Sequence, residues 1–160
     1  MKKSILFVCL GNICRSPTAE GVFRHLLKTE SPQLRVDVDS AGTADYHVGR
    51  APDERSRRAA LRRGIDLSGL RARRVTTADF SRFDLILAMD RQNLLDLQSM
   101  APPAARAQLG LFLEYAEGVE ELDVPDPYYG DGSGFERVLD LTTRAARGLI
   151  AALGRPGPPR

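Results

Sequence analysis

The chain has 160 residues and a formal net charge of +2, from 23 basic and 21 acidic side chains. This balance argues against nucleic acid as a partner, and no apolar run approaches the ~20 residues that a membrane-spanning helix needs. The two cysteines, Cys9 and Cys14, are too close together to frame a secreted disulfide scaffold. They are typical of a reducing compartment, so we expect a cytoplasmic protein.

A strand, a loop and a helix are predicted first. The apolar run 5–9 superficially resembles a signal peptide, but Gly11 and Arg15 cut it short, and we interpret it as a buried strand. Ser16 is the predicted N-cap of the following helix, and Pro17 is its first residue. The helix presents one apolar face at i, i+3, i+4, i+7 and i+8 spacing: Ala19, Val22, Phe23, Leu26 and Leu27.

The rest of the chain alternates in the same way. Further strand-like runs occupy 36–39, 85–89 and 109–113, and helices are predicted from after Pro52 to Gly64, from after Asp90 to before Pro102, and from about Gly134. Alternation of this kind is the signature of a parallel sheet covered by helices. We expect a monomeric α/β protein with one domain, residues 1–153, and a frayed tail, 154–160. It should be a three-layer sandwich whose four-stranded parallel sheet has the order 2-1-3-4, with helices on both faces.

The loop between the first strand and the first helix is predicted to bind a phosphate or sulfate anion. Its sequence is Cys9-Leu10-Gly11-Asn12-Ile13-Cys14-Arg15-Ser16-Pro17. Backbone N–H groups of a tight loop and of a helix N-terminus can converge on an anion, and Gly11 and Asn12 tolerate the positive φ that such a loop requires. The same donors would stabilise a nucleophilic thiolate at Cys9, while the planar fork of Arg15 can hold two phosphate oxygens.

This loop resembles that of the low-molecular-weight protein tyrosine phosphatases, which has the form C-x-G-N-x-C-R-S-P near the N-terminus. Several ordered motifs extend the resemblance along almost the whole chain: Ser40-Ala41-Gly42-Thr43, Asp53, Met89-Asp90 and Asp126-Pro127-Tyr128-Tyr129-Gly130. The resemblance implies hydrolysis of phosphotyrosine in proteins through a phosphocysteine intermediate, without metal or cofactor. It assigns Cys9 as nucleophile, Arg15 as phosphate clamp and Asp126 as general acid and base.

The resemblance also implies roles for the surrounding residues. Asn12, Ser16 and Ser40 match residues that brace the loop, and Asp90 is expected to support it. The predicted substrate-binding residues are Leu10, Gly11, Asn12, Ile13, Cys14, Tyr46, Tyr128 and Tyr129. Leu70 departs from the pattern, since the family often has there a histidine tied into the loop's hydrogen bonds, and the network must therefore close differently.

Other functions remain as alternatives. Arsenate reductases resemble this loop but relay oxidation through downstream cysteines, and none follows Cys14. Protein arginine phosphatases also resemble it but carry threonine where this chain has Ile13. A non-catalytic phosphate-binding module could use the same loop, although the presence of both Cys9 and Asp126 argues against it.

Three further features have simpler interpretations. Cys14 is either a packed side chain or a partner that traps oxidised Cys9 as a disulfide. His25 and His47 lack metal-ligand spacing, and we interpret both as surface or structural residues. The basic cluster after Pro52 is most simply a solvated helix face: Arg55, Arg57, Arg58, Arg62 and Arg63.

Overall fold

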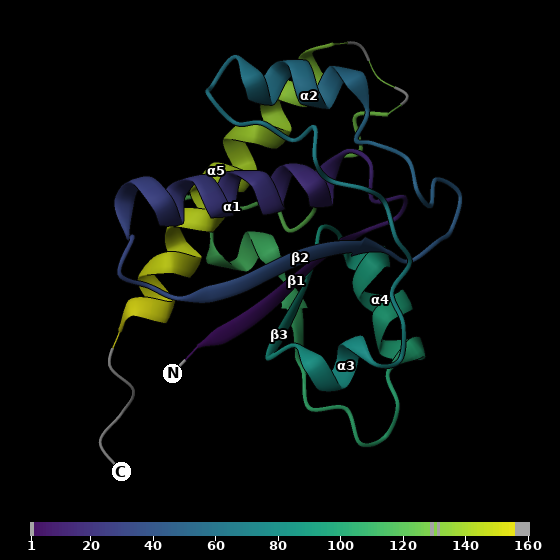
Figure 1. Cartoon of the computed structure of the whole chain (residues 1–160). Helices are drawn as coiled ribbons and strands as arrows, with labels where there is room; N and C mark the ends of the chain where they lie inside the picture. The colour runs from purple at the N-terminus through teal and green to yellow at the C-terminus, as the bar shows by residue number, and fades with distance from the viewer. Residues whose placement is uncertain (1, 129, 131, 156–160) are drawn as a thin grey trace.

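A parallel sheet of four strands forms the middle layer of the protein (Figure 1). The structure, a computed structural model, describes residues 2–128, 130 and 132–155. The strands are β1 (Lys3–Cys9), β2 (Val36–Gly42), β3 (Leu85–Ala88) and β4 (Gln108–Leu111). They lie in the order β2-β1-β3-β4, with every neighbouring pair parallel. The predicted fold class and strand order are confirmed.

Helices cover both faces of this sheet. Alternate side chains of β1 enter two separate cores: Ile5 and Phe7 face one, and Leu6 and Val8 face the other. On the first face lie α1 (Arg15–Glu30) and α5 (Ser133–Gly154), with α2 (Glu54–Leu61) against α5 (Figure 1). On the second face lie α3 (Asp79–Arg82) and α4 (Arg91–Met100). A strand buried on both sides is continuously apolar, which explains the unbroken run in β1.

The predicted boundaries differ from the structure at a few points. The apolar run 109–113 leaves the sheet at Leu111 and continues as a 3₁₀ helix, η1 (Phe112–Tyr115). In η1 the ring of Phe112 packs at a tilt against that of Phe7, at 4.8 Å between ring centroids. The four-residue α3 was not predicted, because it is too short to show a helical period. The last helix extends to Gly154, the first residue of the predicted tail, and residues 156–160 of that tail lie outside the described residues. Within the described ranges, no helix is long and apolar enough to cross a membrane.

The fold gathers the predicted site at one edge of the sheet. Cys9 is the last residue of β1 and lies opposite Gly42, the last residue of β2. Asp90 follows β3 by two positions and begins α4 as its N-cap. Ligands of open α/β sheets bind at this carboxyl edge, so the topology alone brings these motifs together.

Candidate active site

The Cys9 loop (residues 9–16) curls so that a backbone amide points at the Cys9 sulfur. Asn12 has a φ of 56°, and it is the only non-glycine residue with positive φ in the described part of the chain. This left-handed conformation turns the Asn12 N–H toward Cys9 Sγ, at 3.3 Å. The loop therefore already points one donor at the position where negative charge on sulfur would develop.

Neighbouring segments fix both ends of the loop. The amides of Thr43 and Ala44 donate to the carbonyls of Cys9 and Leu10, at 2.9 and 3.0 Å. Gly42 allows this approach, because a Cβ there would lie 2.6 Å from the Leu10 oxygen. At the other end of the loop, the amide of residue 53 donates to the carbonyl of residue 13 at 2.8 Å. The backbone is thus held in place by the residues that follow β2 and by the N-cap of α2.

Ser16 belongs to the loop and not to the helix cap. The helix α1 begins at Arg15 with Cys14 as its N-cap, so the prediction of Ser16 as N-cap was wrong. Its hydroxyl oxygen lies 3.0 Å from Cys9 Sγ and accepts a hydrogen bond from Asn12 Nδ2 at 2.8 Å. The Ser16 hydroxyl therefore forms contacts within the site and does not cap the helix.

The side chain of Asn12 joins several segments around the loop. Its Nδ2 also donates to Ser40 Oγ at 3.0 Å, and its Oδ1 accepts from the backbone N–H of Arg73 at 3.0 Å. Leu70, where the family pattern has histidine, packs against the apolar core. The hydrogen-bond network around Asn12 is completed instead by the backbone amide of Arg73, three residues after Leu70.

The side chain of Arg15 lies beneath the rest of the loop, between the carboxylates of Asp90 and Asp126. Its side chain is only 4% exposed, and its Nη1 donates to Asp90 Oδ2 at 2.6 Å and to the Val124 carbonyl at 3.1 Å. Burial lowers the pKa of Arg15, but the opposing effects of Cys9, Asp90 and Asp126 are larger and raise it overall. The guanidinium therefore carries a permanent positive charge at the base of the site.

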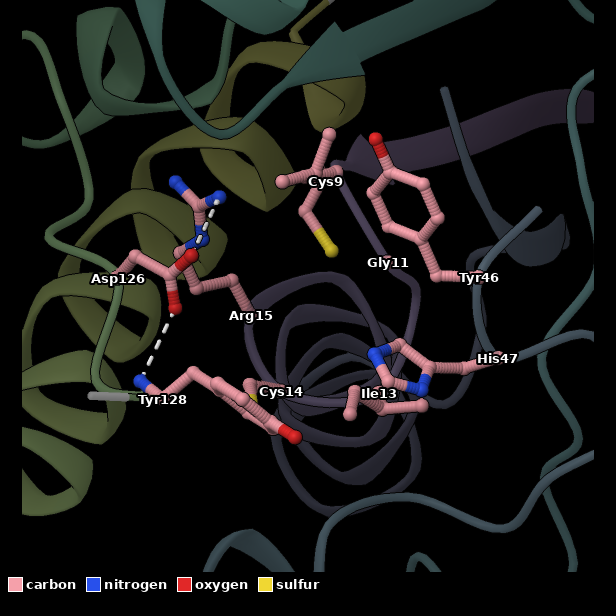
Figure 2. A pocket seen from close by; sticks show the side chains of 10 residues that line it. Cys9, Gly11, Ile13, Cys14, Arg15, Tyr46, His47, Asp126 and Tyr128 are labelled. Carbon is pink, nitrogen blue, oxygen red and sulfur yellow. Dashed lines mark hydrogen bonds and ion pairs between the residues drawn. The ribbon is translucent and has the colours of Figure 1, made fainter. Parts of the chain in front are cut away.

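The Asp126 segment (residues 124–128) lies across the pocket from Cys9. Figure 2 shows Cys9 Sγ pointing into the space between Asp126, Tyr128 and His47. One Asp126 oxygen accepts from the Tyr128 amide at 3.0 Å, and the other lies 3.6 Å from Arg15 Nη2. The carboxylate remains 38% exposed, so it can reach both the pocket and water.

Arg55 ties this segment to α2, which corrects the interpretation of the arginine cluster as a purely solvated face. Its guanidinium donates to the Tyr128 carbonyl at 3.0 Å and pairs with Asp53 at 3.1 Å. It also lies 4.7 Å from the ring centroid of Phe135 and 5.7 Å from that of Tyr128. Arg58 and Arg62 of the same cluster are exposed, as predicted.

Apolar and aromatic side chains form the walls of the pocket. It has a volume of about 80 Å³ and is lined by Cys9, Leu10, Gly11, Ile13, Cys14, Arg15, Tyr46, His47, Asp126 and Tyr128. Tyr46 stands at the rim, 70% exposed. Tyr129, also predicted to bind substrate, lies outside the described residues.

His47 is a pocket residue that the sequence analysis missed. Its ring lies 5.9 Å from that of Tyr128 and over Gly11, where a Cβ would come within 2.9 Å of the imidazole. The signal available was its position immediately after Tyr46, which was itself predicted to line the pocket.

The second cysteine of the loop differs chemically from the first. Burial, together with the nearby carboxylate of Asp53, raises the pKa of Cys14 to about 12. Cys14 is therefore a thiol at neutral pH, whereas Cys9 Sγ accepts a hydrogen bond from the Asn12 amide and lies 3.0 Å from the Ser16 hydroxyl. Of the two, only Cys9 has an environment suited to a nucleophile.

The chemistry open to this site is limited by its composition. Among the residues that the structure describes, no group of three or more His, Cys, Asp or Glu could hold a metal ion. What is present is a sulfur that faces a backbone amide and a hydroxyl, a buried guanidinium, and an accessible carboxylate opposite. Such a set, in a loop at a strand-to-helix turn of an α/β protein, is suited to binding a tetrahedral anion and to transferring a group from it.

Comparison with known proteins identifies the family. The family described as low molecular weight phosphotyrosine protein phosphatase matches residues 4–157. The human protein of that name is 43% identical over 150 residues, covering 92% of this chain and 94% of its own length. The chain belongs to the low molecular weight phosphotyrosine protein phosphatase family, whose members are hydrolases.

Solved structures agree with this membership. A protein tyrosine phosphatase from Entamoeba histolytica superimposes with a TM-score of 0.89 at 38% identity, covering 94% of this chain and 96% of that one. A drosophila arginine phosphatase superimposes with a TM-score of 0.88 at 32% identity, covering 94% and 98%. The same scaffold therefore occurs in proteins named for two different phosphorylated side chains.

Proposed function

We propose that this protein hydrolyses phosphotyrosine in proteins, with Cys9 as nucleophile, Arg15 as phosphate clamp and Asp126 as general acid and base. The observation that carries the proposal is the position of Cys9 Sγ, which faces Asp126 across the pocket while Asn12 N–H and Ser16 Oγ lie 3.3 and 3.0 Å from it (Figure 2). Membership of the family supports the same assignment.

In the first step, the phosphate group enters the Cys9 loop and meets the loop amides and Arg15. The Cys9 thiolate attacks phosphorus, and an S–P bond forms as the P–O bond to the tyrosine breaks. Asp126, in its protonated form, gives its proton to the departing phenolic oxygen. Arg15 stabilises the charge on the equatorial phosphate oxygens during the transfer.

In the second step, water replaces the phenol. Asp126, now a carboxylate, takes a proton from this water while the water oxygen attacks phosphorus. The S–P bond breaks, its electron pair returns to Cys9 as a thiolate, and inorganic phosphate leaves. Ser16 supports this departure, because its hydroxyl lies within hydrogen-bond distance of the sulfur.

The walls of the pocket favour an aromatic phosphomonoester. Ile13 and Tyr128 flank the entrance and Tyr46 extends it outward, so a phenyl ring carrying the phosphate has apolar and aromatic contacts on its faces. Phosphoserine is too short to make these contacts while its phosphate lies in the loop.

A protein arginine phosphatase is the second candidate. It is favoured by the structural similarity to the drosophila arginine phosphatase, which is comparable to that with the tyrosine phosphatase. Against it stands Ile13, whose side chain offers no hydrogen bond to a phosphoguanidine.

The test is phosphate release from peptides that differ only in phosphotyrosine, phosphoserine or phosphoarginine, with a chelator present. We expect rapid, chelator-resistant turnover of phosphotyrosine alone, lost in Cys9→Ser. Preference for phosphoarginine would transfer the assignment to the second candidate. Binding of all three peptides without turnover would identify a phosphate-binding module instead.

A further inference from the structure

A carboxylate that the proposed reaction does not use is buried behind the Cys9 loop. Glu20 lies one helical turn beyond Ser16 on α1 and is only 1% exposed. Burial raises the pKa of Glu20, although hydrogen bonds from Ser40 and Arg24 act in the opposite direction. A buried ionisable group is costly unless it is paired, so its contacts are informative about its role.

The contacts form one chain of hydrogen bonds from Glu20 to Cys9. Ser40 Oγ lies 2.8 Å from Glu20 Oε1 and accepts from Asn12 Nδ2 at 3.0 Å. The second N–H of the same Asn12 amide is donated to Ser16 Oγ, which in turn lies 3.0 Å from Cys9 Sγ. The chain therefore runs from Glu20 on α1 through Ser40 on β2 to three residues of the Cys9 loop, Asn12, Ser16 and Cys9.

Proton counting fixes the direction of the bonds made by Asn12 and Ser40 and leaves Ser16 with one proton to donate. Each serine accepts from Asn12 and has one hydroxyl proton left to donate. Ser40 donates its proton to Glu20, and Ser16 has Cys9 Sγ at 3.0 Å or the more distant Ala41 carbonyl at 3.4 Å. With an acceptor at Glu20, every donor in the chain is satisfied when the Ser16 proton points to sulfur.

Without that acceptor, the direction is no longer fixed. The Ser40 hydroxyl would need another acceptor, and the Asn12 amide, 3.0 Å away, could supply one only by rotating to present Oδ1. This rotation would remove the hydrogen bond from Asn12 Nδ2 to Ser16 Oγ, and the Ser16 hydroxyl would no longer be oriented by Asn12. The Arg73 amide, which donates to Asn12 Oδ1, opposes this rotation. Without the Glu20 acceptor, the orientation of the Asn12 amide would therefore depend on competition between the Arg73 amide and the Ser40 hydroxyl.

Arg24 makes a charged acceptor tolerable at this depth. Its Nε donates to Glu20 Oε2 at 2.9 Å in an i, i+4 pair, and its Nη2 donates to the Val38 carbonyl on β2. Arg24 is 53% exposed whereas the Glu20 side chain is 2% exposed. The cation thus remains hydrated while it balances a carboxylate that is not.

We propose that Glu20, balanced by Arg24, is a positioning residue that orients the Ser16 hydroxyl toward Cys9 through Ser40 and Asn12. This role deepens the proposed phosphatase function and rests on it, because it acts on the proposed nucleophile. Glu20 itself touches neither substrate nor sulfur.

Two matched double variants isolate the acceptor. In Glu20→Gln with Arg24→Met, the amide oxygen still accepts from Ser40, and no arginine donor faces the amide nitrogen. In Glu20→Leu with Arg24→Met, a side chain of similar size offers no acceptor. Glu54→Leu with Arg58→Met removes an exposed i, i+4 pair on α2 and serves as the control.

The measurement is the rate of Cys9 alkylation by iodoacetate at pH 6 and pH 9, with folding checked by circular dichroism. We expect the Leu/Met variant to react about 10-fold more slowly than the unchanged protein at pH 6 and similarly at pH 9, because it loses one hydrogen bond to a charged sulfur. The Gln/Met variant and the control should stay within about twofold. Equal rates in the two Glu20 variants would overturn the proposal.

Ser40→Ala keeps the test decisive if the Leu/Met variant fails to fold. It removes the link next to Glu20 and should give the same loss at pH 6, so an unchanged rate would also overturn the proposal. Alkylation needs no turnover, whereas the proposed function is tested separately by phosphate release from the unchanged protein. The two failures can therefore be told apart.

Discussion

The two halves of the proposed active site are built in opposite ways. The Cys9 loop is largely buried: it donates a hydrogen bond to Ser40 of β2 and accepts hydrogen bonds from the amides of residues 43, 44, 53 and 73. The Asp126 segment starts at the buried Val124 and reaches the surface at Asp126, and its contacts include the Arg15–Val124 and Arg55–Tyr128 hydrogen bonds and the bond from the Val124 amide to the Met89 carbonyl. One half has a fixed shape before the substrate arrives, and the other half is accessible.

This difference assigns separate tasks to the two halves. A preorganised loop can bind the phosphate dianion and the transition state without rearranging. An exposed carboxylate must meet a leaving group and then a water, so it needs access more than rigidity. Changes in the loop should therefore impair both phosphate binding and turnover, whereas changes in the Asp126 segment should impair turnover alone.

Apart from loss of the nucleophile itself, the largest effect is expected for Arg15→Lys. Lysine keeps the charge but loses the fork that can hold two phosphate oxygens, and it leaves Asp90 without its 2.6 Å partner. We expect kcat/KM for a phosphotyrosine peptide to fall about 10³-fold, with weaker inhibition by inorganic phosphate. Arg91→Lys, at an exposed arginine paired with Asp123, is the control. A loss below about 10-fold would contradict the clamp.

Asp126→Asn should separate turnover from binding. Asparagine can still accept from the Tyr128 amide through its oxygen but cannot act as an acid. We expect kcat for phosphotyrosine to fall about 10²-fold, with a smaller loss for an aryl phosphate whose phenol leaves without protonation. Inhibition by phosphate should be nearly unchanged, and Asp123→Asn should be neutral. Equal slowing of both substrates would rule out Asp126 as the acid.

A smaller effect is expected for Arg55→Met, which releases the Asp126 segment from α2. The variant loses the bond to the Tyr128 carbonyl and the stacking over Phe135. We expect kcat to fall about fivefold with unchanged phosphate inhibition. Arg58→Met, on the same helix but paired only at the surface, should have no effect. If phosphate binding weakened as much as kcat, the two halves would not be separable.

The smallest effect on activity is expected for Cys14→Ala, so the test of this residue relies on labelling and stability. Because its pKa is raised to about 12, it should remain unmodified when iodoacetamide labels Cys9 at pH 8, and unfolding should expose both thiols. The raised pKa also means that the folded state disfavours ionisation. Relative to Cys14→Ala, the free energy of unfolding should therefore be constant below pH 9.0 and decrease as the pH rises toward about 12. Rapid labelling of Cys14 in the folded protein would contradict this.

The sequence predicts most of the fold, because each long element has its own signal. The doubly buried β1 is continuously apolar, and α1 and α5 have clear apolar faces. The helices α2 and α4 were predicted to start after Pro52 and after Asp90, and their N-caps in the structure are Asp53 and Asp90. The errors are local. The helix α3 is a single turn, too short to show a helical period. The run 109–113 ends as strand at Leu111 and enters η1 at Phe112, because tertiary packing and not propensity decides where the chain leaves the sheet.

The sequence predicts the composition of the candidate site better than its contacts. A motif can identify Cys9 and Arg15, but the reassignment of Ser16 from cap to loop depends on where the sulfur lies. The bridge from Arg55 to Tyr128 joins residues 73 positions apart, and no local pattern encodes it. His47 was overlooked because a single imidazole without metal-ligand spacing carries no sequence signal of its own.

The most direct test of the central claim is to trap the covalent intermediate. Asp126→Ala would be mixed with p-nitrophenyl phosphate, whose good leaving group allows the first step while the second lacks its base, and then quenched in acid. Mass spectrometry of the digest should find one phosphate on Cys9, and none when Cys9→Ser is added. Phosphate on another residue, or turnover without any phosphorylated protein, would contradict Cys9 as the nucleophile.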